Sequence, residues 1–183
     1  TAKVSSSNLI ILDVLKGVKS WMNFFKTKRS GVLSDNAQIG LFAELSMLKY
    51  LLEYNPNKLL IVVNSWVGPK GQNQDFIFPN TNALEIKCTT TNNPYEVRIN
   101  NEYQLDASGL DKLFLGVYQV KRHKISGGSL FISLPNIIRE IEELLKTSPQ
   151  AKFEFKNLLI EVGYLVSAEI EYVDFGFQII NKT

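Results

Sequence analysis

The spacing of apolar residues changes along this chain, and the changes restrict the folds open to it. Apolar residues three or four positions apart are typical of helices and predict them over residues 7–25, 35–54, 136–146 and 153–162. Short β-rich or alternating runs predict strands over residues 59–66, 74–78, 83–88, 95–99, 113–120, 129–134 and 169–180, the last as a strand or hairpin. Helices, then a sheet, then helices predict an α/β fold with a mixed central sheet.

Length and composition narrow the class further. The 183 residues suit one domain, with a helix and basic loop over residues 1–34, a core over 35–134 and late helices and strands over 135–183. One Cys and one His exclude a structural zinc site built from this chain alone. The early apolar run is far too short to cross a bilayer and no secretory signal pattern is present. We therefore expect a cytoplasmic protein without a membrane partner.

Three charged residues stand in otherwise apolar strands of the expected sheet. Asp75 lies in the run from Gln74 to Phe78, and Glu85 and Lys87 lie in the run from Ala83 to Cys88. Side chains alternate along a strand, so Glu85 and Lys87 share one face, and a hairpin turn brings Asp75 beside Glu85. Clustered carboxylates form a site for a hard cation such as Mg²⁺ or Mn²⁺. A neighbouring Lys suits orienting a water molecule and offsetting phosphate charge.

An Asp followed about ten residues later by Glu-x-Lys on a strand resembles the PD-(D/E)XK nuclease superfamily, which has the restriction-endonuclease-like fold. The similarity covers roughly residues 36–120 and extends to a set of bacterial proteins named only for this motif. It includes the runs 66–69, 74–78, 84–87 and 97–105. The Pro of the superfamily name is absent, since Gln74 precedes Asp75.

The resemblance implies further site residues. A preceding helix often supplies another acid, and Glu44 is the candidate because its neighbours three and four residues away are Gly40, Leu41, Met47 and Leu48. An unpaired carboxylate on such an apolar face is costly, and a metal or basic partner would relieve the cost. Gln104 resembles a polar residue that some nuclease families place near the scissile phosphate. The implied metal ligands are Glu44, Asp75 and Glu85, with Asp75, Glu85, Lys87 and Gln104 as the catalytic set.

The function implied by the resemblance is Mg²⁺- or Mn²⁺-dependent endonucleolytic hydrolysis of DNA, in restriction, phage defence or DNA repair. Lys121, Arg122 and Lys124 belong to the densest basic run and are candidates for contacts with nucleic acid; the alternative is a solvated hairpin loop. Double-strand cleavage needs two active sites, so a homodimer or larger complex fits. Two alternatives remain: a catalytically inactive nucleic-acid-binding or interaction subunit, and a surface hairpin in which Glu85 and Lys87 merely pair.

Overall fold

The computed structural model describes residue 18 and residues 32–90, 97, 99, 102–125 and 131–183. Apart from residue 18, which is helical, the predicted helix over 7–25 lies outside these residues, as do the basic loop after it and most of the predicted strand over 95–99. The helices are α2 (Asp35–Tyr54), α3 (Leu59–Ser65), α4 (Leu134–Leu144), α5 (Pro149–Val162) and α6 (Glu169–Tyr172). The strands are β1 (Phe76–Ile77), β2 (Asn82–Thr89), β3 (Lys112–Lys124) and β4 (Phe175–Lys182), and the 3₁₀ turns are η1 (Gly68–Lys70), η2 (Glu102–Leu105) and η3 (Val166–Ala168).

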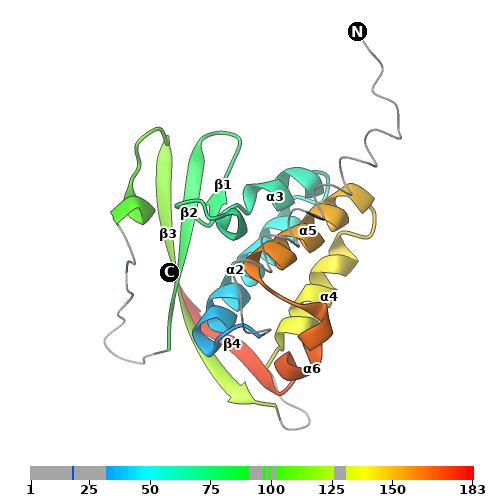
Figure 1. Ribbon diagram of the computed structural model, residues 1–183. Helices are drawn as coiled ribbons and strands as arrows, with labels where there is room; N and C mark the ends of the chain where they lie inside the picture. Colours follow the sequence, from blue (N-terminus) through cyan, green and yellow to red (C-terminus); the bar gives the residue numbers. More distant parts are fainter. Residues whose placement is uncertain (1–17, 19–31, 91–96, 98, 100–101, 126–130) are drawn as a thin grey trace.

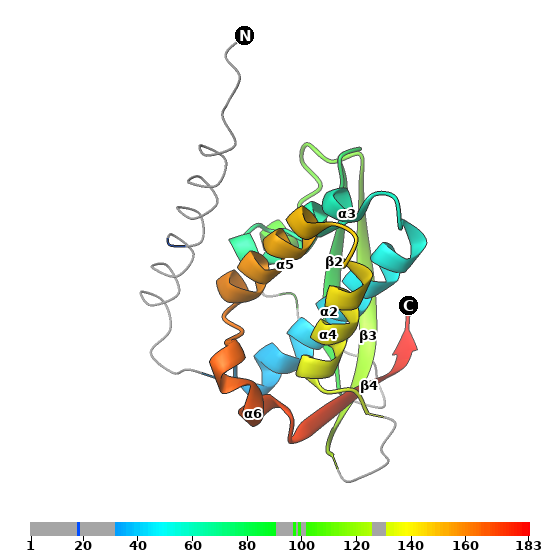
Figure 2. The same ribbon diagram turned by 90° about the vertical axis from the view of Figure 1, so that its right-hand side faces the viewer.

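The four strands form one mixed sheet in the order β1-β2-β3-β4. β1 and β2 are antiparallel, β2 and β3 are parallel, and β3 and β4 are antiparallel. Helices α2, α4 and α5 stand together on one side of the sheet in both views (Figures 1 and 2). The expected α/β architecture, a mixed sheet flanked by helices, is confirmed.

Helix α2 forms the layer next to the sheet, and its sequence explains both its ends and its packing. Ser34 caps its start by accepting a hydrogen bond from the backbone N–H of Ala37 at 3.3 Å. Its apolar stripe is fully buried and consists of Leu41, Leu45, Leu48 and Leu52. The helix ends at Asn55-Pro56, as predicted.

The predicted strand over 59–66 is wrong, because residues 59–65 form helix α3. Leu59, Val62 and Val63 are buried while Ile61 is half exposed, which is the spacing of a helix that covers one face. A short apolar run fits either structure by periodicity alone. This run packs against α5, and this packing favours the helix over the strand.

The other boundaries also differ from the predictions where tertiary partners intervene. The run 121–124, expected as a connection, continues β3 because β4 pairs with it from Lys121 to Lys124. The segment predicted as a late strand or hairpin, residues 169–180, contains helix α6 followed by most of strand β4. Strand β1 is shorter than the predicted strand over 74–78. Helix α5 begins at Pro149, four residues earlier than predicted. Within the predicted strand over 129–134, Ile132 forms an isolated bridge with Phe177.

Candidate active site

The β1–β2 hairpin places Asp75 opposite Glu85, as predicted. Phe76 pairs with Leu84 and Ile77 with Ala83, so the next pair in this register is Asp75 with Glu85. One carboxylate oxygen of Asp75, Oδ2, accepts a hydrogen bond from the backbone N–H of Ile86 at 2.7 Å. This bond holds the Asp75 carboxylate against the edge of β2 and leaves its other oxygen, Oδ1, to face the rest of the site.

Glu85 and Lys87 form a buried ion pair on one face of β2. Lys87 Nζ donates to Glu85 Oε1, and the whole Glu85 residue is only 1% exposed. The second oxygen, Glu85 Oε2, is buried and has no hydrogen-bond partner among the described residues. A buried charge pair carries a large desolvation cost, and an unpartnered oxygen adds to it. The alternative of an exposed surface pair is therefore wrong.

Glu44 reaches this region from helix α2. Its Oε2 accepts a hydrogen bond from Trp66 Nε1 at 2.8 Å, and Trp66 is fully buried at the end of α3. Trp66 also bridges to Phe76 of β1, so the residue that holds Glu44 is attached to the hairpin that carries Asp75. Sequence reasoning missed Trp66, although a buried indole N–H needs an acceptor and could have indicated one nearby.

Gly68 leaves the space in which Asp75 and Glu44 face each other. A Cβ atom at Gly68 would lie 3.0 Å from Asp75 Oδ1 and 3.4 Å from Glu44 Oε2. The backbone here is fixed, because the N–H groups of Val67 and Gly68 both donate to the Asp75 carbonyl, at 2.8 and 3.0 Å. Gly68 belongs to one of the runs that carry the family resemblance, and the structure gives it this role.

We expect Gly68→Ala to weaken Mg²⁺ or Mn²⁺ binding without unfolding the protein. The φ angle of Gly68 is not in the left-handed region, so alanine is allowed there. Its methyl group would occupy the space between the two carboxylates. Isothermal titration with Mn²⁺ should show an affinity at least about tenfold lower, whereas Gly40→Ala, at a position with open space for a Cβ, is the matched control. Equal Mn²⁺ affinities in the two variants would contradict this role.

Two carboxyl groups of this cluster, those of Glu44 and Asp75, have raised pKa values. Burial, and next the charge of Asp75, raise the pKa of Glu44 to about 8. Burial, and next the charge of Glu85, raise the pKa of Asp75 to about 6, while the hydrogen bond from Ile86 N–H opposes the shift. Bringing a cation among these groups would favour their charged forms.

The residues present fit a hard divalent cation. The donors are all carboxylate oxygens, which Mg²⁺ and Mn²⁺ prefer. Glu85 Oε2 is buried without a partner among the described residues, and the missing side chain at Gly68 leaves room beside Asp75 and Glu44. In the described part of the chain, however, no three acidic, His or Cys side chains already converge as a ligand set. The carboxylates are neighbours with the correct chemistry, not a preformed cage.

The connection from β2 to β3 is attached to the hairpin through Gln74. The Gln74 side-chain amide donates to the carbonyls of Tyr103 and Asp106, at 3.1 and 3.4 Å. Gln104 lies in η2 between these two acceptors and is half-buried. Gln74 therefore places the segment that carries Gln104 next to Asp75, while a contact of Gln104 with substrate stays a prediction.

The predicted basic residues belong to strand β3 and differ in their surroundings. Arg122 makes two hydrogen bonds to the Asp35 carboxylate, at 2.8 and 2.9 Å, and its guanidinium lies 3.6 Å from the centre of the Phe175 ring. These contacts join β3 to the start of α2 and give Arg122 a role inside the protein. Lys121 and Lys124 are exposed, and their contact with nucleic acid stays a prediction.

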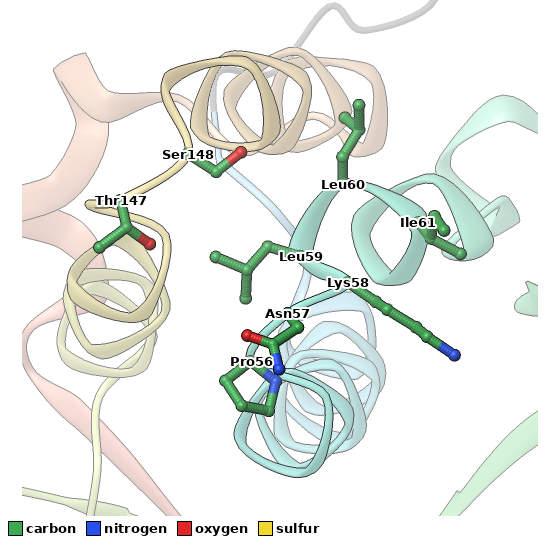
Figure 3. A pocket seen from close by; sticks show the side chains of 8 residues that line it. All are labelled: Pro56, Asn57, Lys58, Leu59, Leu60, Ile61, Thr147 and Ser148. Atoms are coloured by element: carbon green, nitrogen blue, oxygen red, sulfur yellow. The ribbon is translucent and has the colours of Figure 1, made fainter.

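A separate pocket of about 410 Å³ opens between the α2–α3 turn and the α4–α5 turn (Figure 3). Its lining contains none of the predicted site residues; it consists of Pro56, Asn57, Lys58, Leu59, Leu60, Ile61, Thr147 and Ser148. The Lys58 side chain extends away from Thr147 and Ser148 (Figure 3), and the Ser148 hydroxyl caps α5 by accepting from Ala151 N–H. The polar groups of this pocket do not converge on one point.

Among the described helices, none combines the length and the apolar character needed to cross a membrane.

Comparison with families of known proteins gives a match. The family model described as "Putative PD-(D/E)XK family member, (DUF4420)" matches residues 1–183, the whole of this sequence. No curated protein and no solved structure matches the chain.

Proposed function

The chain belongs to the DUF4420 family of the PD-(D/E)XK group, and from this membership and the site we propose that it hydrolyses phosphodiester bonds in DNA with Mg²⁺ or Mn²⁺. The observation that carries the proposal is the acidic cluster around Glu85, whose Oε2 is buried beside Lys87 without a partner among the described residues. If Glu85 and Lys87 formed only a structural ion pair, the nearby carboxyl groups of Glu44 and Asp75 would not stabilise it. The raised pKa values of these two groups are instead typical of a functional site.

Asp75, Glu85 and Glu44 would hold the cation through carboxylate oxygens. When bound, Mg²⁺ supplies Lewis acidity toward the phosphate and lowers the pKa of a water molecule. The chain keeps its ligands in place through the Ile86 N–H on Asp75 and the Trp66 indole on Glu44. These contacts fix the orientation of carboxylates that would otherwise repel one another.

Lys87 would position the attacking water and offset the growing charge on the phosphate oxygens. Hydrolysis adds the oxygen of one water to phosphorus and breaks one P–O ester bond, and the departing oxygen takes a proton. An ammonium group held beside this phosphate stabilises the added negative charge without changing its own position. The Glu85 carboxylate accepts a hydrogen bond from Lys87 Nζ and so directs this group along β2.

The direct test is incubation of the protein with supercoiled plasmid and with single-stranded DNA, in Mg²⁺, Mn²⁺ or EDTA. We expect cleavage with either metal and its complete loss in EDTA, because the carboxylates alone provide no Lewis acid. The same assay on RNA measures the preference between the two nucleic acids. Absence of cleavage with both metals would overturn the proposal and favour the alternative of an inactive nucleic-acid-binding or interaction subunit.

A further inference from the structure

A second pocket, of about 280 Å³, opens beside strands β3 and β4. It is lined by Val97, Val117, Gln119, Asn181 and Thr183. In the parallel pairing of β2 with β3, Lys87 is opposite Val117 and Thr89 is opposite Gln119. Residues paired in register share a face of a sheet, so this pocket lies directly beside the strand that carries Glu85 and Lys87 and on the same face.

Apolar side chains of β3 accompany the charged residues of β2 on this face. Leu115 is opposite Glu85 and is 41% exposed, and the half-buried Val117 is opposite Lys87. An intact duplex presents its charged phosphates and its sugars outward and keeps the flat faces of its bases stacked inside. The exposed Leu115 and half-buried Val117 beside Glu85 and Lys87 therefore match the face of an unpaired base, which binds by stacking and apolar contact.

Two side-chain amides stand at the far side of the pocket. Gln119 is buried and Asn181 is exposed, and the two residues pair in register between β3 and β4. The exposed Asn181 amide has both hydrogen-bond donors and an acceptor, the combination that matches the polar edge of a base. Typical pockets for small molecules run from about 300 to 1,000 Å³, and at about 280 Å³ this pocket suits a small planar group such as one base.

We propose that this pocket binds one unpaired base of the substrate strand next to the cleaved phosphate, and that the protein acts on single-stranded DNA. This inference rests on the proposed function and specifies the substrate of the same site. The base packs against Val117 and Val97, and its edge meets the amide of Asn181. The phosphate attached to the bound nucleotide then lies toward Lys87.

The test measures DNA binding in EDTA, where no cleavage occurs. Fluorescence anisotropy compares a labelled single strand, the matched duplex and a strand of abasic residues. The pocket is filled by Val117→Phe, and the matched control is Val166→Phe, an exposed position in η3. Because Val117→Phe changes a half-buried residue, Asn181→Ala provides a second variant at an exposed position, and thermal melting confirms that both are folded.

We expect the wild-type protein to bind the single strand about tenfold more tightly than either other probe. Val117→Phe should remove this advantage and Asn181→Ala should reduce it severalfold, while Val166→Phe binds like wild type. Equal binding of single strand and duplex, or two folded pocket variants that bind the single strand like wild type, would overturn the inference. Metal-dependent cleavage would then still support the proposed function, whereas a protein that neither binds nor cleaves any of these DNAs contradicts both.

Discussion

Asp75→Asn and Glu85→Gln are each expected to lower metal-dependent DNA cleavage by about a thousandfold or more. Each substitution keeps the size and shape of the side chain and replaces one anionic oxygen by an amide nitrogen, which is a poor ligand for Mg²⁺. Asp75→Asn can also keep its hydrogen bond from Ile86 N–H through the remaining oxygen. The measurement is the rate of plasmid nicking under saturating Mn²⁺, with thermal melting to show that each variant is folded.

Glu140→Gln is the matched control for these two variants. Glu140 is a partly exposed carboxylate of α4 that pairs with Lys49 at 2.9 Å, and it belongs to the helical layer. The same chemical change there should leave cleavage within about twofold of wild type. If Asp75→Asn or Glu85→Gln also cleaved at that rate, the residue concerned would not belong to the active site.

Lys87→Ala is also expected to abolish cleavage, and it should lower the stability of the protein as well. Removing the ammonium leaves Glu85 as an uncompensated charge that is 1% exposed, and breaking a buried pair in this way costs about 3–5 kcal/mol. The burial of the pair therefore predicts that this variant is less stable than wild type. Thermal melting of Lys87→Ala therefore accompanies the cleavage assay, and a variant that is folded but inactive at the assay temperature separates catalysis from stability.

Glu44→Gln is expected to stabilise the metal-free protein at pH 8 and to reduce the stabilisation that Mn²⁺ provides. Because the pKa of Glu44 is raised from 4.5 to about 8 in the folded protein, the unfolded chain loses this proton first as pH rises. The contribution of Glu44 to the free energy of unfolding is therefore fully present below about pH 4.5 and is lost between pH 4.5 and 8. Glutamine carries no such proton, so the variant should be more stable at pH 8 by on the order of 2 kcal/mol.

Melting temperatures at pH 5 and pH 8, each with EDTA and with millimolar Mn²⁺, measure both effects. In EDTA the variant should melt about 4–8 °C above wild type at pH 8 and show a much smaller difference at pH 5. Metal binds the native state only, so Mn²⁺ should raise the wild-type melting temperature more than that of the variant. An equal shift with Mn²⁺ in both proteins would remove Glu44 from the metal site and leave it as a buried structural carboxylate held by Trp66.

The core of the site could be predicted from the sequence because strand periodicity is a local property. Charged residues two apart in an apolar strand must share a face, so the sequence by itself places Glu85 and Lys87 together. A short turn sets the hairpin register, and the register brings Asp75 opposite Glu85. Helix α2 was predicted with its observed bounds, because its apolar stripe is long and Asn55-Pro56 marks its end.

The remaining features depend on contacts between segments far apart in the sequence. The run from Leu59 is a helix because α5 covers it, and β3 extends to Lys124 because β4 pairs with it. Arg122 binds Asp35, 87 residues away, and Trp66 reaches Glu44 across 22 residues. The local spacing of residues determines which face of its helix or strand a side chain occupies. The partner that the side chain meets on that face depends on how the helices and strands pack, so only the tertiary structure could decide these contacts.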